Sequence, residues 1–139
     1  MKKEQLVRHE FEPVYDKNSE ILILGSFPSV KSREQGFYYG HPQNRFWKVL
    51  AAIVQEKIPD SIEEKKEMLL RNHIAVYDVI WQCKITGSSD SSIKDVVPAD
   101  ITTIVELSKI RKIYANGKLA EKLFSKYQEK KVGIKAIGL

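Results

Sequence analysis

The sequence predicts an α/β domain, a three-layer α/β/α sandwich around a central four-stranded, mainly parallel sheet. Short apolar runs typical of buried strands alternate along the chain with segments whose apolar residues recur at helical spacing. Strands that alternate with helices form right-handed crossovers, and the resulting parallel sheet is covered on both faces. The length of 139 residues fits a single domain over 1–139.

The first half of the chain supplies two strands and two helices. The β-branched run 21–24 predicts a buried strand, and a loop rich in Ser, Gly and Pro is expected over 26–43. A helix is expected from Asn44. Its predicted apolar face consists of Phe46, Val49, Leu50, Ile53 and Val54. A Ser-x-x-Glu capping box opens a second helix over 61–70, and the apolar run 74–80 predicts the second strand.

The second half repeats this alternation. The polar segment 86–92 is expected to be a loop, and Asp100 is placed to cap a short helix. A third strand is predicted at 112–115. The clearest amphipathic helix of the chain follows at 119–127, and 134–137 is typical of a fourth strand.

Composition restricts the classes of function. No run approaches the roughly 18 apolar residues of a membrane span, and the basic start lacks the apolar stretch of a signal peptide. The single cysteine, Cys83, cannot form an internal disulfide, which favours a reducing, cytoplasmic setting. The net charge is +5, and segment 109–135 holds nine Lys or Arg against two acids. A polyanionic partner fits this charge, as does a merely solvated basic surface.

Several familiar chemistries have no support in the sequence. It contains neither the Gly-x-Gly-x-x-Gly nor the Gly-x-x-x-x-Gly-Lys-Ser/Thr phosphate loop, and no Gly-x-Ser-x-Gly nucleophile elbow. His9, His41 and His73 are too scattered for a metal site. Cys83 follows an apolar run and is expected to be a structural thiol rather than a nucleophile. We therefore expect no cofactor and no metal.

Two segments around the first predicted loop form an unusual constellation. Segment 25–29 reads Gly-Ser-Phe-Pro-Ser, and segment 37–47 reads Phe-Tyr-Tyr-Gly-His-Pro-Gln-Asn-Arg-Phe-Trp. Here the sequence resembles the uracil-DNA glycosylase superfamily, and most closely its mismatch-specific and hypoxanthine-type branch. Segment 77–90, with Tyr-Asp-Val-Ile, the cysteine, Gly-Ser and a later Asp, resembles the second block of that branch. Ala-Asn-Gly at 115–117 resembles the third, so the resemblance spans about residues 20–139.

The resemblance implies a base-excision repair enzyme that hydrolyses the N-glycosidic bond of a deaminated base (hypoxanthine, uracil or xanthine) after flipping it out of the duplex. The expected partner is DNA that contains a deaminated or mismatched base. The protein is expected to bind it as a monomer and not to associate with a membrane. The residues expected to bind the base are Gly25, Ser26, Phe27, Tyr38, Tyr39 and Asn116. Those expected to contact DNA are Ser29, Lys31, Ser32, His41 and Lys118.

The expected catalytic residue, Asn44, differs in position from that of most family members. Most members place an Asp or Asn after the first strand to position the attacking water, whereas this chain has Phe27 there. The hypoxanthine-type branch shares that departure and uses the Asn of its His-Pro-x-Asn segment, which is Asn44 here. A purely structural role as a helix N-cap is the alternative for Asn44, and equally for Asn116. Tyr38 and Tyr39 suit base stacking or packing, while Phe46 and Trp47 favour the core.

Two other interpretations of the sequence stay open. The family follows its fourth strand with a Pro- and Ser-rich groove-entering loop and a final helix, and the sequence ends at Leu139 where that loop is expected. We expect a chain shortened relative to the family. Together with Phe27, this favours a non-catalytic nucleic-acid-binding remnant as the first alternative. An α/β domain of another family, which binds or hydrolyses a small molecule, is the second.

Overall fold

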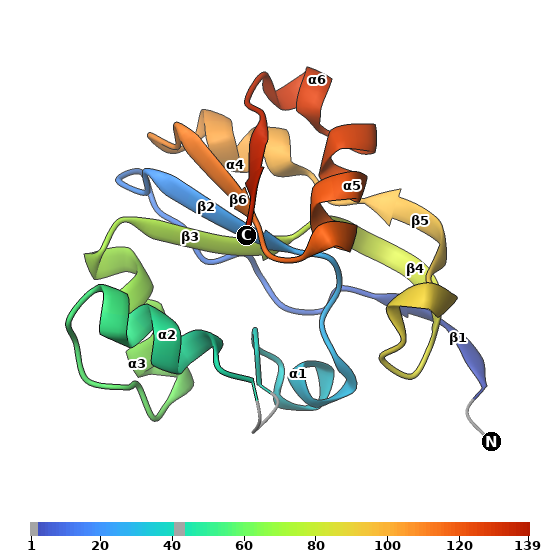
Figure 1. The fold of residues 1–139 in the computed structure, drawn as a ribbon, viewed down its shortest axis with the longest axis horizontal. Coiled ribbons are helices and arrows are strands. Elements are labelled where there is room, and N and C mark those ends of the chain that lie inside the picture. Colours follow the sequence, from blue (N-terminus) through green and yellow to red (C-terminus); the bar gives the residue numbers. More distant parts are fainter. Residues whose placement is uncertain (1–2, 41–43) are drawn as a thin grey trace.

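A parallel sheet lies at the centre of the computed structural model, which describes residues 3–40 and 44–139. Its strands are β2 (Ile21–Gly25), β3 (Ile74–Asp78), β6 (Lys112–Ala115) and β7 (Ala136–Gly138). Their order is β3-β2-β6-β7, and every neighbouring pair is parallel. The four-stranded parallel sheet predicted from the sequence is confirmed (Figure 1).

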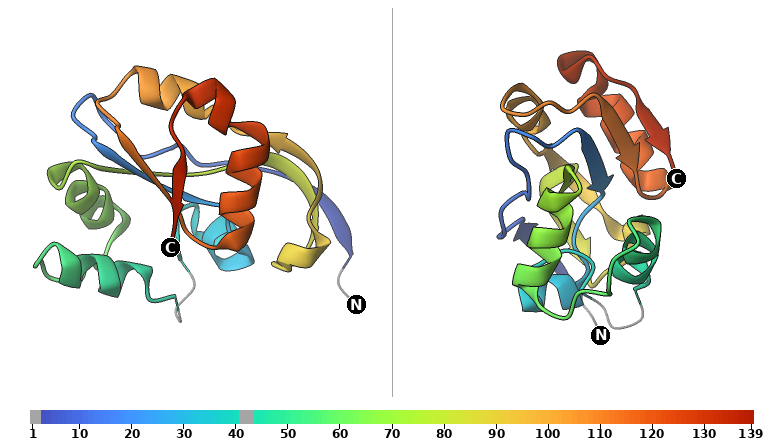
Figure 2. Two further views of the ribbon diagram at one scale, coloured as in Figure 1. Left: turned by 45° about the horizontal axis from the view of Figure 1, so that its top comes forward. Right: turned by 90° about the vertical axis from the view of Figure 1, so that its left-hand side faces the viewer.

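Helices cover both faces of this sheet, as the three-layer prediction requires. All five residues of β3 are buried although their side chains alternate between the two faces, so neither face is open to solvent along that strand. The helices are α1 (Val30–Gln35), α2 (Phe46–Ile53), α3 (Ile62–Arg71), α4 (Ile101–Glu106), α5 (Lys118–Tyr127) and α6 (Glu129–Val132), with a 3₁₀ turn η1 (Asp90–Ser92). Figure 2 shows the sheet and helices from two further directions. None of these helices is long and apolar enough to cross a membrane.

Two predicted helix starts are confirmed by their caps. The Ser61 hydroxyl accepts a hydrogen bond from the backbone N–H of Glu64 at 3.1 Å, which begins α3. Asp100 begins α4 in the same way, through the N–H of Thr103 at 3.1 Å. In both cases a short polar side chain satisfies an N–H group that has no partner within the helix.

A second, antiparallel sheet was not predicted. It comprises β1 (Glu4–Arg8), β4 (Ile80–Thr86) and β5 (Lys94–Pro98) in the order β1-β4-β5. The strand expected over 74–80 is confirmed over 74–78 but not to its predicted end. The chain leaves the parallel sheet at Val79, whose N–H bonds the Gly25 carbonyl at 2.8 Å, and Ile80 begins β4. Register shifts between β4 and β5 blur the alternation of apolar and polar residues, which explains why the pattern was missed.

Two further expectations around the first loop need correction. The segment 26–43 contains α1, which ends at Gly36 in the left-handed conformation with φ 71°. The buried residues of α2 are Trp47, Leu50 and Ala51, whereas Val49 and Ile53, predicted to be buried, are 50% and 71% exposed. The Trp47 indole donates a hydrogen bond to the Tyr38 carbonyl at 3.1 Å, and this anchor sets which face of α2 is buried.

Candidate active site at the carboxyl edge of the parallel sheet

The register of the parallel strands brings three chemically distinct positions to one edge. Gly25 at the end of β2 pairs with Asp78 at the end of β3. On the other side Leu24 pairs with Ala115 of β6, and the next residue, Asn116, donates its N–H to the Leu24 carbonyl at 2.8 Å. Ligands of parallel α/β sheets bind beyond the carboxyl ends of the strands, so this is the edge where a site is expected.

A cavity of about 150 Å³ lies at this edge. Nine of the twelve residues expected to form the site line it, namely Gly25, Ser26, Phe27, Ser29, Ser32, Tyr38, Tyr39, Asn44 and Asn116. Pro28 and Asp78 complete the lining. Its volume is below the roughly 300–1,000 Å³ of sites for drug-sized ligands, so it suits one small planar group.

Tyr39 presents a buried hydroxyl to this cavity. Its backbone is in the left-handed region, with φ 53°, and its ring stacks on Phe46 with centroids 3.9 Å apart. The hydroxyl has no hydrogen-bond partner among the described residues. Burial raises the pKa of Tyr39, and Asp78 raises it further. The nearby Asn116 carboxamide lowers this pKa, although it does not meet hydrogen-bond geometry with the Tyr39 hydroxyl. Tyr39 therefore stays a neutral phenol, free to donate a hydrogen bond to a ligand.

Tyr38 forms a packed wall of the cavity. It is 2% exposed, and its hydroxyl donates to the Glu12 carbonyl at 2.8 Å. Burial raises the pKa of this hydroxyl well above its ordinary value, with Asp78 adding to the effect. The two roles weighed for Tyr38, packing and pocket lining, are thus combined in one side chain.

The two candidate amides both lie at the exposed mouth of the cavity. The Asn44 side-chain oxygen accepts a hydrogen bond from the N–H of Phe46 at 2.9 Å, so Asn44 does help to begin α2. For Asn116 the N-cap interpretation is wrong: the N-cap of α5 is Gly117, and no side chain in the described part of the chain caps that helix. The Asn116 carboxamide is left available for a ligand.

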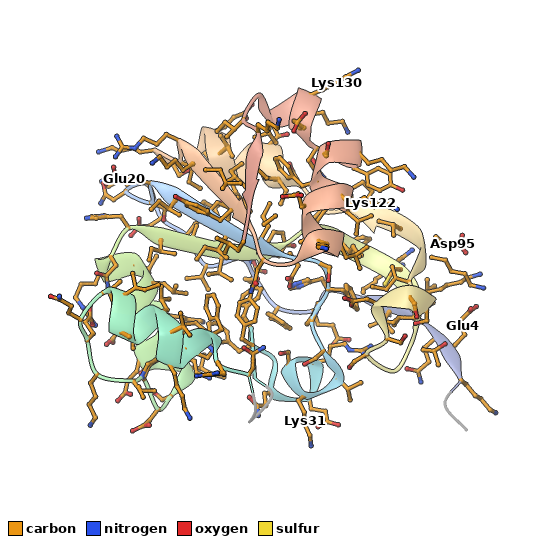
Figure 3. The ribbon with its side chains drawn as sticks, viewed as in Figure 1. Glu4, Glu20, Lys31, Asp95, Lys122 and Lys130 are labelled. Carbon is orange, nitrogen blue, oxygen red and sulfur yellow. The ribbon has the colours of Figure 1, made fainter. Side chains whose placement is uncertain are left out.

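The residues expected to contact DNA fall into two groups. Ser29 and Ser32 have structural partners: Ser29 caps α1 at 3.2 Å, and the buried Ser32 hydroxyl accepts from the N–H of Gly40 at 2.9 Å. Lys31 is exposed, points away from the fold (Figure 3) and pairs with a glutamate one turn away on α1, and Lys118 is exposed at the start of α5. The predicted contact of His41 lies outside the described residues.

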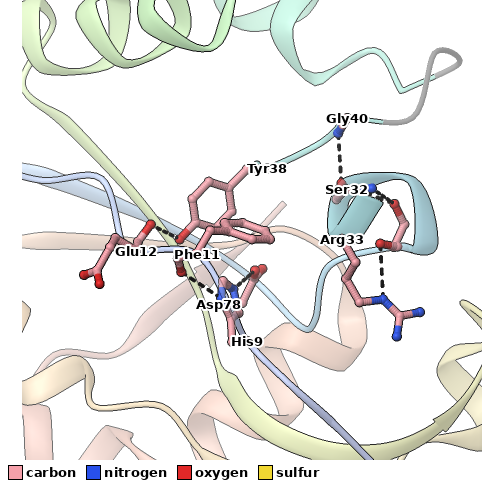
Figure 4. A network of polar contacts seen from close by, with 9 residues as sticks. His9, Phe11, Glu12, Ser32, Arg33, Tyr38, Gly40 and Asp78 are labelled. Atoms are coloured by element: carbon pink, nitrogen blue, oxygen red, sulfur yellow. Dashed lines mark hydrogen bonds and ion pairs between the residues drawn. The ribbon is translucent and has the colours of Figure 1, made fainter. Parts of the chain in front are cut away.

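Sequence reasoning missed two site residues, Asp78 and His9. The Asp78 carboxylate lines the cavity, and its Oδ2 lies 2.7 Å from Nε2 of the buried His9 (Figure 4). The other ring nitrogen, Nδ1, lies 3.0 Å from the Phe11 carbonyl oxygen. A charged residue at the end of an apolar parallel strand was a usable signal for Asp78. His9 is 69 residues away in sequence, and no local pattern connects the two.

The loop before η1 forms hydrogen bonds that hold helix α1 in place. Arg33 on α1 donates to the Gly87 carbonyl at 2.6 Å, and its guanidinium carbon lies 5.7 Å from the centroid of the Phe27 ring. The Ser88 hydroxyl accepts from the N–H of Val30 at 2.8 Å. The Gly-Ser pair singled out in the sequence therefore supports α1 rather than lining the cavity.

Cys83 is fully buried on β4, which agrees with the structural thiol expected from the sequence, and burial raises the pKa of its thiol. Within residues 3–40 and 44–139, no three or more His, Cys, Asp and Glu side chains come together as metal ligands.

Comparisons with known proteins agree with this geometry. The chain is 38% identical over 117 residues to a hypoxanthine DNA glycosylase of Methanosarcina acetivorans, covering 83% of this chain and 74% of that protein. It is 37% identical over 110 residues to the enzyme of the same name from Methanosarcina barkeri, covering 78% and 70%. A solution NMR structure from M. acetivorans, described provisionally as a uracil DNA glycosylase, superposes with a TM-score of 0.81 at 33% identity, covering 96% of this chain and 84% of that one.

The family model of the uracil DNA glycosylase superfamily matches residues 12–137, which include the residues that line the cavity, the strands β2, β3 and β6, and β7 except for its last residue. This chain belongs to the uracil DNA glycosylase superfamily.

Proposed function

We propose that this protein is a DNA glycosylase that hydrolyses the N-glycosidic bond of a deaminated base, with hypoxanthine, uracil and xanthine as candidate substrates. The observation that supports this most directly is the cavity of about 150 Å³ at the carboxyl edge of the sheet, which combines aromatic rings with free amide and hydroxyl groups. Relatives named hypoxanthine DNA glycosylase make hypoxanthine the first substrate to test.

The site offers what a flipped base needs. Leaving the stack costs a few kcal/mol, least for a mispaired base, and stacking on an aromatic ring returns about 1–3 kcal/mol per base. Tyr39 provides a ring and a free hydroxyl, and Phe46 supports that ring from behind. Asn116 adds an amide that both donates and accepts, which matches the neighbouring N–H and C=O groups of a deaminated base.

The chemical step needs a positioned water and stabilised charge, and no covalent nucleophile. As the bond between C1′ and the base nitrogen breaks, positive charge develops on the sugar and negative charge on the base. Asn44 is our candidate for holding the water, because its carboxamide lies at the mouth of the cavity. Phe27, which lines the same cavity, has no group that could do so.

Two exposed lysines outside the cavity lining are proposed to hold the phosphates of DNA, which the protein would bind as a monomer. Lys31 on α1 and Lys118 on α5 are both exposed. Contacts of this kind supply affinity without lesion preference, and they weaken as salt rises because counterions are released on binding.

An excision assay tests this function. Duplexes with one hypoxanthine, uracil or xanthine, and a normal duplex as the matched control, are incubated with the protein, and abasic sites are counted after alkaline cleavage. Excision of at least one lesion base, and none from the normal duplex, is expected. Binding of these duplexes without any excision would instead support the non-catalytic remnant.

Base reading by Asn116 is tested with Asn116→Asp, which keeps the shape but replaces the amide donor with a carboxylate that only accepts. The relative excision rates of the three lesion bases should change more than the affinity for DNA. An equal loss for all three bases that follows a loss of folded protein would contradict this role.

A further inference from the structure

The hydrogen-bond partners of the imidazole indicate that His9 and Asp78 share a proton. Nδ1 lies 3.0 Å from the carbonyl oxygen of Phe11, which can only accept, so Nδ1 carries a hydrogen. Nε2 lies 2.7 Å from Oδ2 of Asp78. A neutral imidazole with its hydrogen on Nδ1 would direct a lone pair at an ionised carboxylate. One further proton therefore lies between the two groups, on Nε2 or on the carboxyl group.

This proton is shielded from solvent but adjoins the cavity. The His9 side chain is 0% exposed and that of Asp78 is 6% exposed. Aromatic rings surround the imidazole, with Phe11 and Tyr77 centroids at 4.5 and 4.9 Å (Figure 4 shows the polar contacts). Asp78 is the one carboxylate among the described residues that line the cavity. Its Oδ1 rests against the end of β2, only 2.4 Å from where a Cβ on Gly25 would lie.

We propose that the His9–Asp78 pair is the proton donor to the departing base, with Asp78 as the catalytic acid facing the cavity and His9 as the positioning residue that supplies its proton. The inference rests on the proposed glycosylase function and adds to it. His9 precedes the residues matched by the family model, 12–137, and so lies outside the part of the chain that the family pattern describes.

The step balances as follows. The bond between C1′ and the base nitrogen breaks, and its electron pair goes to the base. The Asp78 carboxyl group gives a proton to the base. Until a proton returns, the pair is left as a neutral imidazole whose Nε2 lone pair faces a carboxylate, the unfavourable arrangement that the shared proton otherwise prevents. Water adds its oxygen to C1′ and releases one proton, which returns to the pair. The products are the protonated base and the sugar hydroxyl, and the His9–Asp78 pair is restored.

The other titratable groups near the pair do not compete for this role. Burial and Asp78 together raise the pKa of Tyr38 and Tyr39, and the same two effects raise that of Tyr77 to about 12. These phenols stay protonated at the pH of an excision assay. The Arg33 guanidinium carbon lies 5.7 Å from the centroid of the Phe27 ring.

The test compares uracil with 5-fluorouracil in the same duplex. Fluorine stabilises the departing anion, so 5-fluorouracil depends less on a proton donor. His9→Gln and Asp78→Asn keep the size and a hydrogen bond but hold no transferable proton. Because general acid catalysis contributes typically 10²–10⁴-fold, we expect each variant to excise uracil about a hundredfold more slowly and 5-fluorouracil no more than about tenfold more slowly. The matched control His73→Gln, at an exposed histidine at the other end of β3, should leave both rates unchanged.

NMR spectroscopy gives a second result. Nitrogen-15 NMR of the folded wild-type protein, together with carbon-13 NMR of its aspartates, should show either a doubly protonated His9 or a protonated Asp78 near neutral pH. This measurement does not require the variants to fold.

Three results would overturn the inference. An equal fall in the excision rates of uracil and 5-fluorouracil would mean that His9 and Asp78 have only a structural role. NMR signals of a singly protonated His9 beside an ionised Asp78 would show that the pair shares no additional proton. A wild-type protein that excises no lesion base overturns the proposed function, and this inference with it. The first two results leave the proposed function standing.

Discussion

The two sheets of this protein divide the work of the site. The parallel sheet places lining residues of the cavity at the ends of β2 and β3 and just after β6, and the connection from β2 to α2 supplies the others. The antiparallel sheet contributes none of the described lining residues. It holds the lining in place, because His9 directly follows β1 and bonds Asp78, while the loop after β4 bonds α1.

The difference in burial explains this division. Every residue of β3 is buried, whereas none of β1 or β5 is. A strand buried on both faces cannot shift without disturbing the core, so the ends of such strands are rigid points for aligning functional groups. A half-exposed sheet tolerates register shifts, such as those between β4 and β5, and serves as an adaptable support. Cavity-facing changes should therefore affect activity, and supporting changes should affect local order.

The largest effect is expected from Asn44→Ala at the cavity mouth. Asn44 is proposed to position the attacking water, and on that proposal its loss should lower the excision rate about a hundredfold or more. Affinity for DNA should barely change because phosphate contacts supply most of it, and stability should fall by about 1 kcal/mol through the lost bond to Phe46. Single-turnover rates and thermal unfolding measure both. An unchanged rate would leave Asn44 with only its structural role at the start of α2.

The next largest effect is expected from Gly25→Ala, at a position where both sheets contact the Asp78 carboxylate through its two different oxygens. The new Cβ would lie 2.4 Å from Oδ1 of Asp78, which His9 holds from the other side. The carboxylate must move, so we expect excision to fall at least tenfold and stability to fall by about 1–3 kcal/mol. Excision rates and chemical denaturation test this. If the rate persists while stability drops, the position of Asp78 is irrelevant to activity.

A smaller effect is expected from Ser88→Ala in the supporting loop. The N–H of Val30 loses its acceptor at 2.8 Å, which costs about 0.5–1.5 kcal/mol at most, since water can replace it at an exposed site. We expect faster hydrogen exchange in α1 and a change of only a few-fold in excision. A loss of activity as large as that of Asn44→Ala would contradict the division between facing and supporting residues.

The smallest effect on the site is expected from Asp100→Ala, which caps α4 and lies outside the cavity lining. Hydrogen bonds from the Thr103 hydroxyl and N–H lower the pKa of Asp100. Its contribution, about 1 kcal/mol, is therefore complete above the ordinary value near 4 and is lost as pH falls through the lowered value. Denaturation at pH 7 and at a lower pH that protonates Asp100 should show a larger difference between variant and wild type at pH 7, with excision unchanged there.

The sequence by itself determined the parallel sheet, most of its helices and most of the cavity lining. Uninterrupted apolar runs such as 21–24 predict strands buried on both faces, and Ser61 and Asp100 mark helix starts through caps that act within four residues. The segments 25–29 and 37–47 are close in sequence to the strand and helix that carry them, so their meeting at one edge followed from the order of elements.

Only the tertiary structure decided the antiparallel sheet, the buried face of α2 and the contact of His9 with Asp78. Each depends on partners far apart in the chain: Arg8 pairs with Gln82 across β1 and β4, and 69 residues separate the two members of the buried pair. The spacing of apolar residues predicts the secondary structure of a segment. It does not predict which group, distant in the sequence, will complete a hydrogen bond. That pairing is decided when the two sheets pack, and in this protein it places His9 against the Asp78 carboxylate at the edge of the cavity.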